Sequence, residues 1–175
     1  MQRGDNEFKN KNYKNAVKEY DNVIKIDPGY AEAYRKRAMA NRARGSDKDS
    51  LRDFNKAIEL DPDNETSTID RSVLLAQLGR AEEALRDVNK ALKPPNHDRT
   101  LYQAACTNAL LNRPRRAVTL LAQAIQVGYK ADKLATDPDL ESIREIDDFQ
   151  TIMRAYFLSN RNRLQQNSSS EGDLQ

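Results

Sequence analysis

A phrase of seven residues occurs twice in this chain, at a separation that defines the length of a repeated unit. RDFNKAI begins at Arg52 and RDVNKAL begins at Arg86, with five of the seven letters identical. Two independent sets of positions continue the same period along the chain: Ile24, Ile58, Leu92 and Ile125, and Ala16, Ser50, Ala84 and Ala117. A period of about 34 residues predicts a repeat architecture in which each supersecondary unit stacks on the next.

Each period divides into two helical halves, as residues 31–64 illustrate. The first half ends at Gly45, a residue that interrupts a helical pattern. The second half carries an apolar stripe at helical spacing and ends at Asp61–Pro62, because the residue before a proline is disfavoured in the α region. The predicted unit is therefore a helix, a tight turn, a second helix and a second turn.

The pattern within each period resembles the tetratricopeptide repeat family, in which small, aromatic, glycine and proline residues recur at set positions. The second repeat carries the full set: Tyr34, Ala38, Gly45, Ser50, Phe54, Ala57 and Pro62. The third repeat departs from the pattern, with Thr68 and Val88 in place of the two aromatic residues. The resemblance covers residues 1 to about 128. It implies an all-α fold, a right-handed superhelix (α-α solenoid) of stacked antiparallel helix pairs.

The boundaries of the parts follow from the period and from the point where it fails. We expect repeats at 1–30, 31–64, 65–97 and 98–128, capping helices at 129–164 and a polar, disordered tail at 165–175. The first repeat has only three residues before Gly4, so we expect it to be N-terminally truncated, in a chain cut from a longer protein.

The period fails after Val127, where a different pattern begins. The stretch GYKADKLATDPDLESIREIDDF resembles a module that closes repeat arrays in many bacterial proteins. Such a module should cover the exposed apolar end of the stack. Tyr156 and Phe157, further along the chain, are alternatively a contact with a second copy or with a partner helix.

Two arginines and two aspartates share one spacing in successive repeats. Arg37 precedes Asp53, and Arg71 precedes Asp87 at the same separation. In an antiparallel helix pair each arginine should face its aspartate. Recurrence at the same place favours a structural ion pair within each repeat over a charged functional site.

Residues that could carry catalysis or bind metals are sparse. His97 is the single histidine and lies in the turn PPNHD, which excludes a catalytic triad or a histidine-rich metal site within this chain. Cys106 is the single cysteine, so an intrachain disulfide is excluded, and a small buried filler is favoured over a nucleophile. We therefore expect no enzyme activity, no cofactor, no metal and no small-molecule substrate.

The sequence also bears on membranes and compartment. No apolar run approaches the roughly 18 residues of a membrane span, and the start of the chain has no apolar core of a signal peptide. We expect a cytoplasmic location.

The family resemblance implies that the first helices of the repeats line a concave groove for a peptide or a segment of a protein partner. The groove positions of the family fall here on a mixed apolar and basic set: Phe8, Arg35, Met39, Arg42, Ile69, Val73, Arg99 and Tyr102. Arginine and tyrosine are common in binding hot spots. We therefore expect a non-catalytic protein–protein interaction module whose ligand has acidic and apolar character. In a variant of the family that clamps C-terminal carboxylates, the clamp positions correspond here to Lys36, Asp70 and Gln103, with Asp5 where an asparagine is expected. This variant is disfavoured, because Asp70 would repel a carboxylate.

Two other classes of function stay open on the sequence alone. The first is a spacer or scaffold region of a larger bacterial multidomain protein, such as a kinase or transferase. The second is an RNA-binding helical repeat, for which the basic stretch from Arg35 to Lys48 is the only support. The formal net charge of +2 is too small to predict a nucleic-acid ligand, so a protein partner is favoured.

Overall fold

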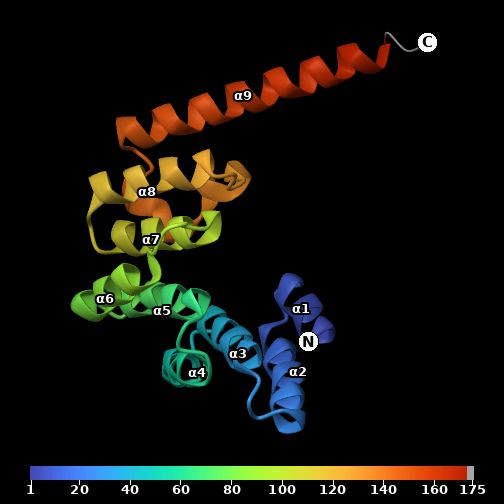
Figure 1. Cartoon of the computed structure of the whole chain (residues 1–175), viewed down its shortest axis with the longest axis vertical. Coiled ribbons are helices and arrows are strands. Elements are labelled where there is room, and N and C mark those ends of the chain that lie inside the picture. The colour runs from blue at the N-terminus through green and yellow to red at the C-terminus, as the bar shows by residue number, and fades with distance from the viewer. Residues whose placement is uncertain (173–175) are drawn as a thin grey trace. The chain divides into compact units, whose positions relative to one another are not determined.

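The computed structural model is helical and describes the backbone of residues 1–172 and the side chains of residues 1–132, 134–159 and 161 (Figure 1). Helices follow one another in pairs: α1 (Gln2–Lys9) and α2 (Tyr13–Ile26), α3 (Ala31–Ala43) and α4 (Asp47–Leu60), α5 (Glu65–Gln77) and α6 (Ala81–Ala91), and α7 (Asp98–Leu110) and α8 (Pro114–Gln126). After these pairs come two 3-10 helices, η1 (Ala131–Thr136) and η2 (Pro138–Ile143), and the long α9 (Asp147–Gly172).

The chain divides into two compact units, Met1–Asn96 and His97–Gln175. Unit 1 holds the first three helix pairs, in which α2 packs on α3 and α4 packs on α5. Unit 2 holds the fourth pair, the two 3-10 helices and α9, and η2 packs on both α7 and α8. The helix pairs form the α-solenoid that the period predicts.

The turn inside every helix pair contains a residue with left-handed backbone conformation. Gly45 and Gly79 have φ values of 76° and 73°, and the equivalent residues of the first and fourth pairs, Lys11 and Asn112, have 61° and 54°. In each turn the next backbone N–H donates to a carbonyl five residues earlier, over 2.8–2.9 Å. This hydrogen bond caps the first helix of the pair. The turn therefore forms even where a side chain makes the left-handed conformation unfavourable by roughly 1–2 kcal/mol.

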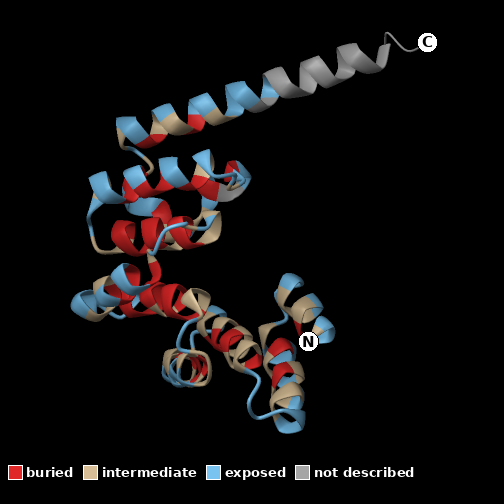
Figure 2. Ribbon diagram, viewed as in Figure 1, coloured by how far each residue is buried: buried red, intermediate tan, exposed pale blue. Residues whose placement is uncertain are grey.

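Small buried residues let the helices of unit 1 approach closely, and Figure 2 shows buried residues along the facing sides of the pairs. Ser50 Oγ on α4 donates to the carbonyl oxygen of Ala38 on α3 over 2.8 Å. Phe54, 1% exposed, packs with Ala38 and with Leu74 of the next pair. A single helix pair cannot bury this apolar face alone, so the face packs against the next pair.

Gly4 on α1 lies against the ring of Tyr20 on α2. A Cβ atom at Gly4 would lie 2.5 Å from Tyr20 Cε1 and 2.8 Å from Cδ1. The ring is 2% exposed and its hydroxyl donates to Asp5 Oδ1 over 2.9 Å, so it has little room to move. Gly4→Ala should lower the free energy of unfolding of unit 1 by about 1–3 kcal/mol, although alanine normally favours a helix by about 1 kcal/mol over glycine. Urea denaturation followed by circular dichroism measures the change.

Gly29→Ala serves as the matched control for this substitution. A Cβ atom at Gly29 would meet only Asp27 Oδ1, at 3.4 Å, and Gly29 is exposed. Its expected effect is within about 0.5 kcal/mol, as for most surface substitutions. A Gly4→Ala chain that is as stable as the parent would contradict the packing argument.

The C-terminal region differs in detail from the expected capping helices. Residues 129–164 contain η1, η2 and the first part of α9. The backbone of residues 165–172 forms the end of α9, and residues 173–175 lie outside the described residues. The disorder expected for the tail at 165–175 stays a prediction. Among the described residues, no helix combines the length and the apolar character needed to cross a membrane.

Candidate functional site

The first helices of the pairs in unit 1, α1, α3 and α5, carry most of the predicted groove residues, and polar contacts link them directly. Lys36 Nζ on α3 donates to both carboxylate oxygens of Asp5 on α1, each over 2.7 Å. Toward the other side, Arg35 on α3 donates to Asp70 Oδ2 on α5 over 2.6 Å. These contacts hold the three helices in one surface, which we call the first-helix face of unit 1.

Arg35 is buried in this face and bonded on several sides. Its side chain is 11% exposed and that of Asp70 is 4% exposed. Glu32 accepts two hydrogen bonds from the guanidinium, each over 2.6 Å, and Met39 Sδ accepts one over 3.4 Å. Burial works to lower the pKa of Arg35, but Glu32 and Asp70 outweigh burial and raise the pKa above its ordinary value. The guanidinium that was predicted to meet a ligand is therefore bonded to acceptors of the chain itself.

Lys36 and Asp5 occupy two positions at which the carboxylate-clamping variant would bind its ligand. In this chain they bind each other, and the Tyr20 hydroxyl also donates to Asp5. Burial works to raise the pKa of Asp5, but the hydrogen bonds from Lys36 and Tyr20 together lower it below its ordinary value. The ammonium that such a clamp would offer to a ligand is thus neutralised internally.

The other predicted residues of this face differ in exposure. Ile69 and Val73 on α5 are fully buried, so their side chains belong to the core. Phe8 packs edge-on against the ring of Tyr13, with 5.4 Å between the ring centroids. Three predicted residues of unit 1 stay partly exposed: Phe8, Met39 and Arg42.

The ion pairs predicted within the repeats are confirmed. Arg37 donates to both oxygens of Asp53 over 2.6–2.7 Å, and Arg71 donates to both oxygens of Asp87 over 2.7 Å. Each arginine also donates through NH1 to a residue on the second helix of the preceding pair, over 2.6–2.7 Å. These further acceptors are Asp21 for Arg37 and Asn55 for Arg71. Each guanidinium therefore joins three helices, not two.

In unit 2, residues 129–146, which contain η1 and η2 and which we call the closing segment, cover the face of α7 that carries the predicted groove residue Tyr102. The hydroxyl of Tyr102 donates to Asp137 Oδ2, and its ring stacks on that of Tyr129 with 4.3 Å between centroids. Further along α7, Ser142 Oγ donates to the carbonyl oxygen of Ala109 over 2.9 Å. Tyr102 is 8% exposed, because Asp137 and Tyr129 of the closing segment cover it. Burial is the main cause that raises the pKa of both tyrosines, to about 12 for Tyr129.

Arg99, the remaining predicted residue of unit 2, lies in the first turn of α7 and is half-buried. Its backbone N–H donates to Asp98 Oδ1 over 2.7 Å. The structure therefore places Arg99 and Tyr102 on one helix but gives them different surroundings.

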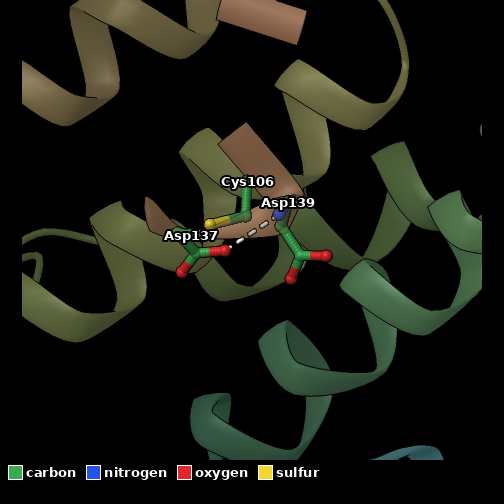
Figure 3. A group of neighbouring side chains, drawn as sticks. All are labelled: Cys106, Asp137 and Asp139. Atoms are coloured by element: carbon green, nitrogen blue, oxygen red, sulfur yellow. Dashed lines mark hydrogen bonds between the residues drawn. The ribbon is translucent and has the colours of Figure 1, made fainter. Parts of the chain in front are cut away.

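Figure 3 shows Cys106 of α7 close to Asp137 and Asp139, which lie at the start of η2. One ligand atom from each of these residues, the thiol sulfur or a carboxylate oxygen, lies within 4.8 Å of the others. Asp137 Oδ1 accepts the backbone N–H of Asp139 over 2.9 Å, and its Oδ2 accepts the hydroxyl of Tyr102. Both oxygens of Asp137 are thus used within the chain, where they cap η2 and fasten it to α7. The cluster has a structural explanation that needs no metal ion.

The two residues considered for catalysis lie in different surroundings. Cys106 is 1% exposed, which makes it a buried filler and not an accessible nucleophile. His97 is exposed at the position just before α7.

Residues that sequence reasoning missed fall into two groups. Asp21 and Asn55 stand one repeat period apart, so the period itself marks them as equivalent acceptors. Asp5 pairs with Lys36 and Asp70 pairs with Arg35 across neighbouring pairs of helices. These two contacts occur once each, and no repeated spacing in the sequence marks them.

Comparison with known proteins places the fold. A family model described as TPR repeat matches residues 4–41. A structure from a functional characterisation of Pseudomonas aeruginosa pilF covers 90% of this chain and 73% of its own, with 17% identity and a TM-score of 0.69. TTC0263, a thermophilic TPR protein of Thermus thermophilus, covers 86% and 77%, with 16% identity and a TM-score of 0.65. MamA covers 97% and 98%, with 16% identity and a TM-score of 0.58. None of the curated proteins compared matches the sequence.

Proposed function

We propose that this chain, which matches a TPR repeat model over residues 4–41 and has the fold of TPR structures, is a non-catalytic protein-binding module that holds a partner segment on the first-helix face of unit 1. The observation that carries the proposal is the set of contacts that join α1, α3 and α5 into one surface. A preformed surface of this kind avoids the conformational entropy that a flexible one loses on binding.

The chemistry of the partner follows from what this face leaves accessible. Met39 offers a partly exposed apolar side chain, and Arg42, one helical turn further along α3, offers a partly exposed guanidinium. Arg42 Nε donates to Gln77 Oε1 over 2.8 Å, which holds the guanidinium against α5. A carboxylate next to an apolar side chain is the ligand that suits this pair. The proposed partner segment is therefore acidic and apolar.

Three of the cations of α3 that suggested an RNA ligand form ion pairs within the chain. Arg35 pairs with Glu32 and Asp70, Lys36 pairs with Asp5, and Arg37 pairs with Asp21 and Asp53. Binding to nucleic acid depends mainly on cations that are free to neutralise phosphates. These internal pairs favour a protein partner over RNA.

A pull-down from cell lysate tests the proposal with a charge reversal that leaves the buried network intact. Arg42→Glu should weaken retention of a partner about tenfold, because it removes the guanidinium and repels a carboxylate. Arg44→Glu is the matched control, since Arg44 lies exposed just after α3 and the substitution makes the same change in charge. Circular dichroism should show both variants folded.

The outcomes separate the proposal from its alternatives. A partner kept by the parent chain and by Arg44→Glu, but lost by Arg42→Glu, would support recognition on the first-helix face. Equal retention by all three chains would move the binding surface elsewhere. If the folded parent retains no protein at all, a spacer or scaffold region within a larger protein becomes the better interpretation.

A further inference from the structure

Two large apolar side chains are exposed near the middle of α9, in unit 2. Phe149 and Met153, in the first turns of α9, are 2% and 6% exposed and anchor the helix to unit 2. One turn later the pattern changes, because Phe157 is 50% exposed and Leu158 is 61% exposed. Figure 2 shows α9 passing from partly buried to exposed along this stretch. Adjacent exposed residues of this size mark an interaction surface more often than scattered single ones do.

These side chains line a groove beside α9, within unit 2. The groove has a volume of about 550 Å³ and includes Phe149, Met153, Arg154, Phe157, Leu158 and Arg161. Ala135 of η1 contributes to the same lining. The lining of the groove is therefore mostly apolar, with Gln150 and two guanidinium groups from α9 and no carboxylate.

The two arginines of the groove differ from those of α3 in their surroundings. Arg35 and Arg37 each bind carboxylates of the chain. Arg154 and Arg161 are exposed, and among the residues that the structure describes neither forms an ion pair. The groove thus presents positive charge that the described part of the chain does not neutralise.

We propose that this groove binds an amphipathic helix of a partner protein that carries acidic side chains beside an apolar stripe. Arg154 and Arg161 are seven residues apart, which on a helix corresponds to about 10 Å. Carboxylates seven residues apart on an antiparallel or parallel partner helix would match that distance. The apolar residues of the partner would cover Phe157 and Leu158, as in other helix-in-groove complexes. The proposal does not depend on the function proposed for unit 1.

Charge decides between this occupant and a second copy of the chain. In a symmetric pair the same patch contacts itself, so the arginines of two copies would be brought to one interface with no carboxylate in either groove. Attachment to an anionic membrane usually takes a cluster of about four to eight basic residues, whereas the lining of this groove has two, which argues against a lipid surface. Both alternatives give distinct results in the experiment below.

The test uses the full chain and two synthetic peptides, each about four helical turns long, measured by fluorescence anisotropy. The first peptide has leucines at helical spacing and glutamates seven residues apart, and the second has lysines in place of the glutamates. The acidic peptide should bind the parent chain, and Arg154→Glu/Arg161→Glu should weaken it about tenfold or more. Phe157→Ala should weaken it by a similar factor, because it removes an aromatic side chain from the interface.

The matched control is Arg115→Glu/Arg116→Glu, which makes the same change in charge at exposed positions of α8. It should change the affinity for the acidic peptide by less than about twofold at physiological salt, where distant charges are screened. The lysine peptide should prefer the Arg154→Glu/Arg161→Glu variant to the parent.

Four results would overturn the proposal. One is the absence of saturable binding of the acidic peptide to the folded parent, and another is equal weakening by the two double variants. Sedimentation velocity that shows a dimer dissociated by Phe157→Asp would assign the groove to a second copy. Co-sedimentation with phosphatidylserine vesicles, lost on Arg154→Glu/Arg161→Glu, would assign it to a lipid surface.

Discussion

Replacing Asp53 with alanine should lower the free energy of unfolding of unit 1 by about 3 kcal/mol. The side chain of Asp53 is 2% exposed and accepts two hydrogen bonds from Arg37, whose own side chain is 17% exposed. Asn41 Nδ2 donates to the same carboxylate over 3.2 Å. The substitution leaves a guanidinium and an amide without their main acceptor in a largely buried place. Because Arg37 keeps its bond to Asp21, we expect the lower end of the roughly 3–5 kcal/mol typical of broken buried pairs.

The control for this prediction lies on the same helix. Asp49 pairs with Arg52 over 3.0 Å, but the side chains are 44% and 70% exposed. Asp49→Ala should therefore change stability by at most about 1 kcal/mol, as exposed ion pairs do. Urea denaturation of both variants, followed by circular dichroism, gives the comparison. Equal losses for the two substitutions would contradict a special role for the buried pair.

Leu140→Ala should loosen the closing segment of unit 2 and lower its stability by about 2–5 kcal/mol. Leu140 lies in η2, which packs on α7, and its side chain is fully buried. The reactivity of the Cys106 thiol reports whether the segment has opened. Cys106 is 1% exposed and lies close to Asp139, the residue before Leu140. Opening of the segment should expose the thiol, so its labelling by a thiol reagent should become at least about tenfold faster.

The chain offers a matched control for this substitution as well. Leu158→Ala makes the same change at a position that is 61% exposed, and it should alter stability by less than about 0.5 kcal/mol. Because Cys106 is the single cysteine, the labelling rate refers to one site. Rapid labelling in the parent chain, or equal acceleration in both variants, would show that the closing segment does not cover α7 in solution.

The contacts that were predicted from the sequence are ones that the period repeats. The pairs of Arg37 with Asp53 and of Arg71 with Asp87 were predictable because both partners recur at one place in successive repeats. The helix pairs were predictable because the buried face of each helix carries apolar residues at helical spacing, and this spacing is visible in the sequence.

Contacts that occur only once were not predictable from the sequence. The period shows that Arg35 and Tyr102 lie on corresponding faces of their helices, but it says nothing about what else packs there. Arg35 meets Asp70, whose position depends on how α5 packs on the preceding pair. Tyr102 meets Asp137, which belongs to a segment outside the period. Both partners follow from tertiary packing, which a local pattern does not encode.

The three-helix contacts of Arg37 and Arg71 have a consequence for how such an array changes length in evolution. Each arginine takes one acceptor from its own repeat and one from the repeat before it, at matching positions. A duplicated block of one full period would bring its own arginine and aspartate, and it would find an acceptor already present on its neighbour. Gene duplication could therefore lengthen the array by one whole unit without the loss of any existing bond of this type.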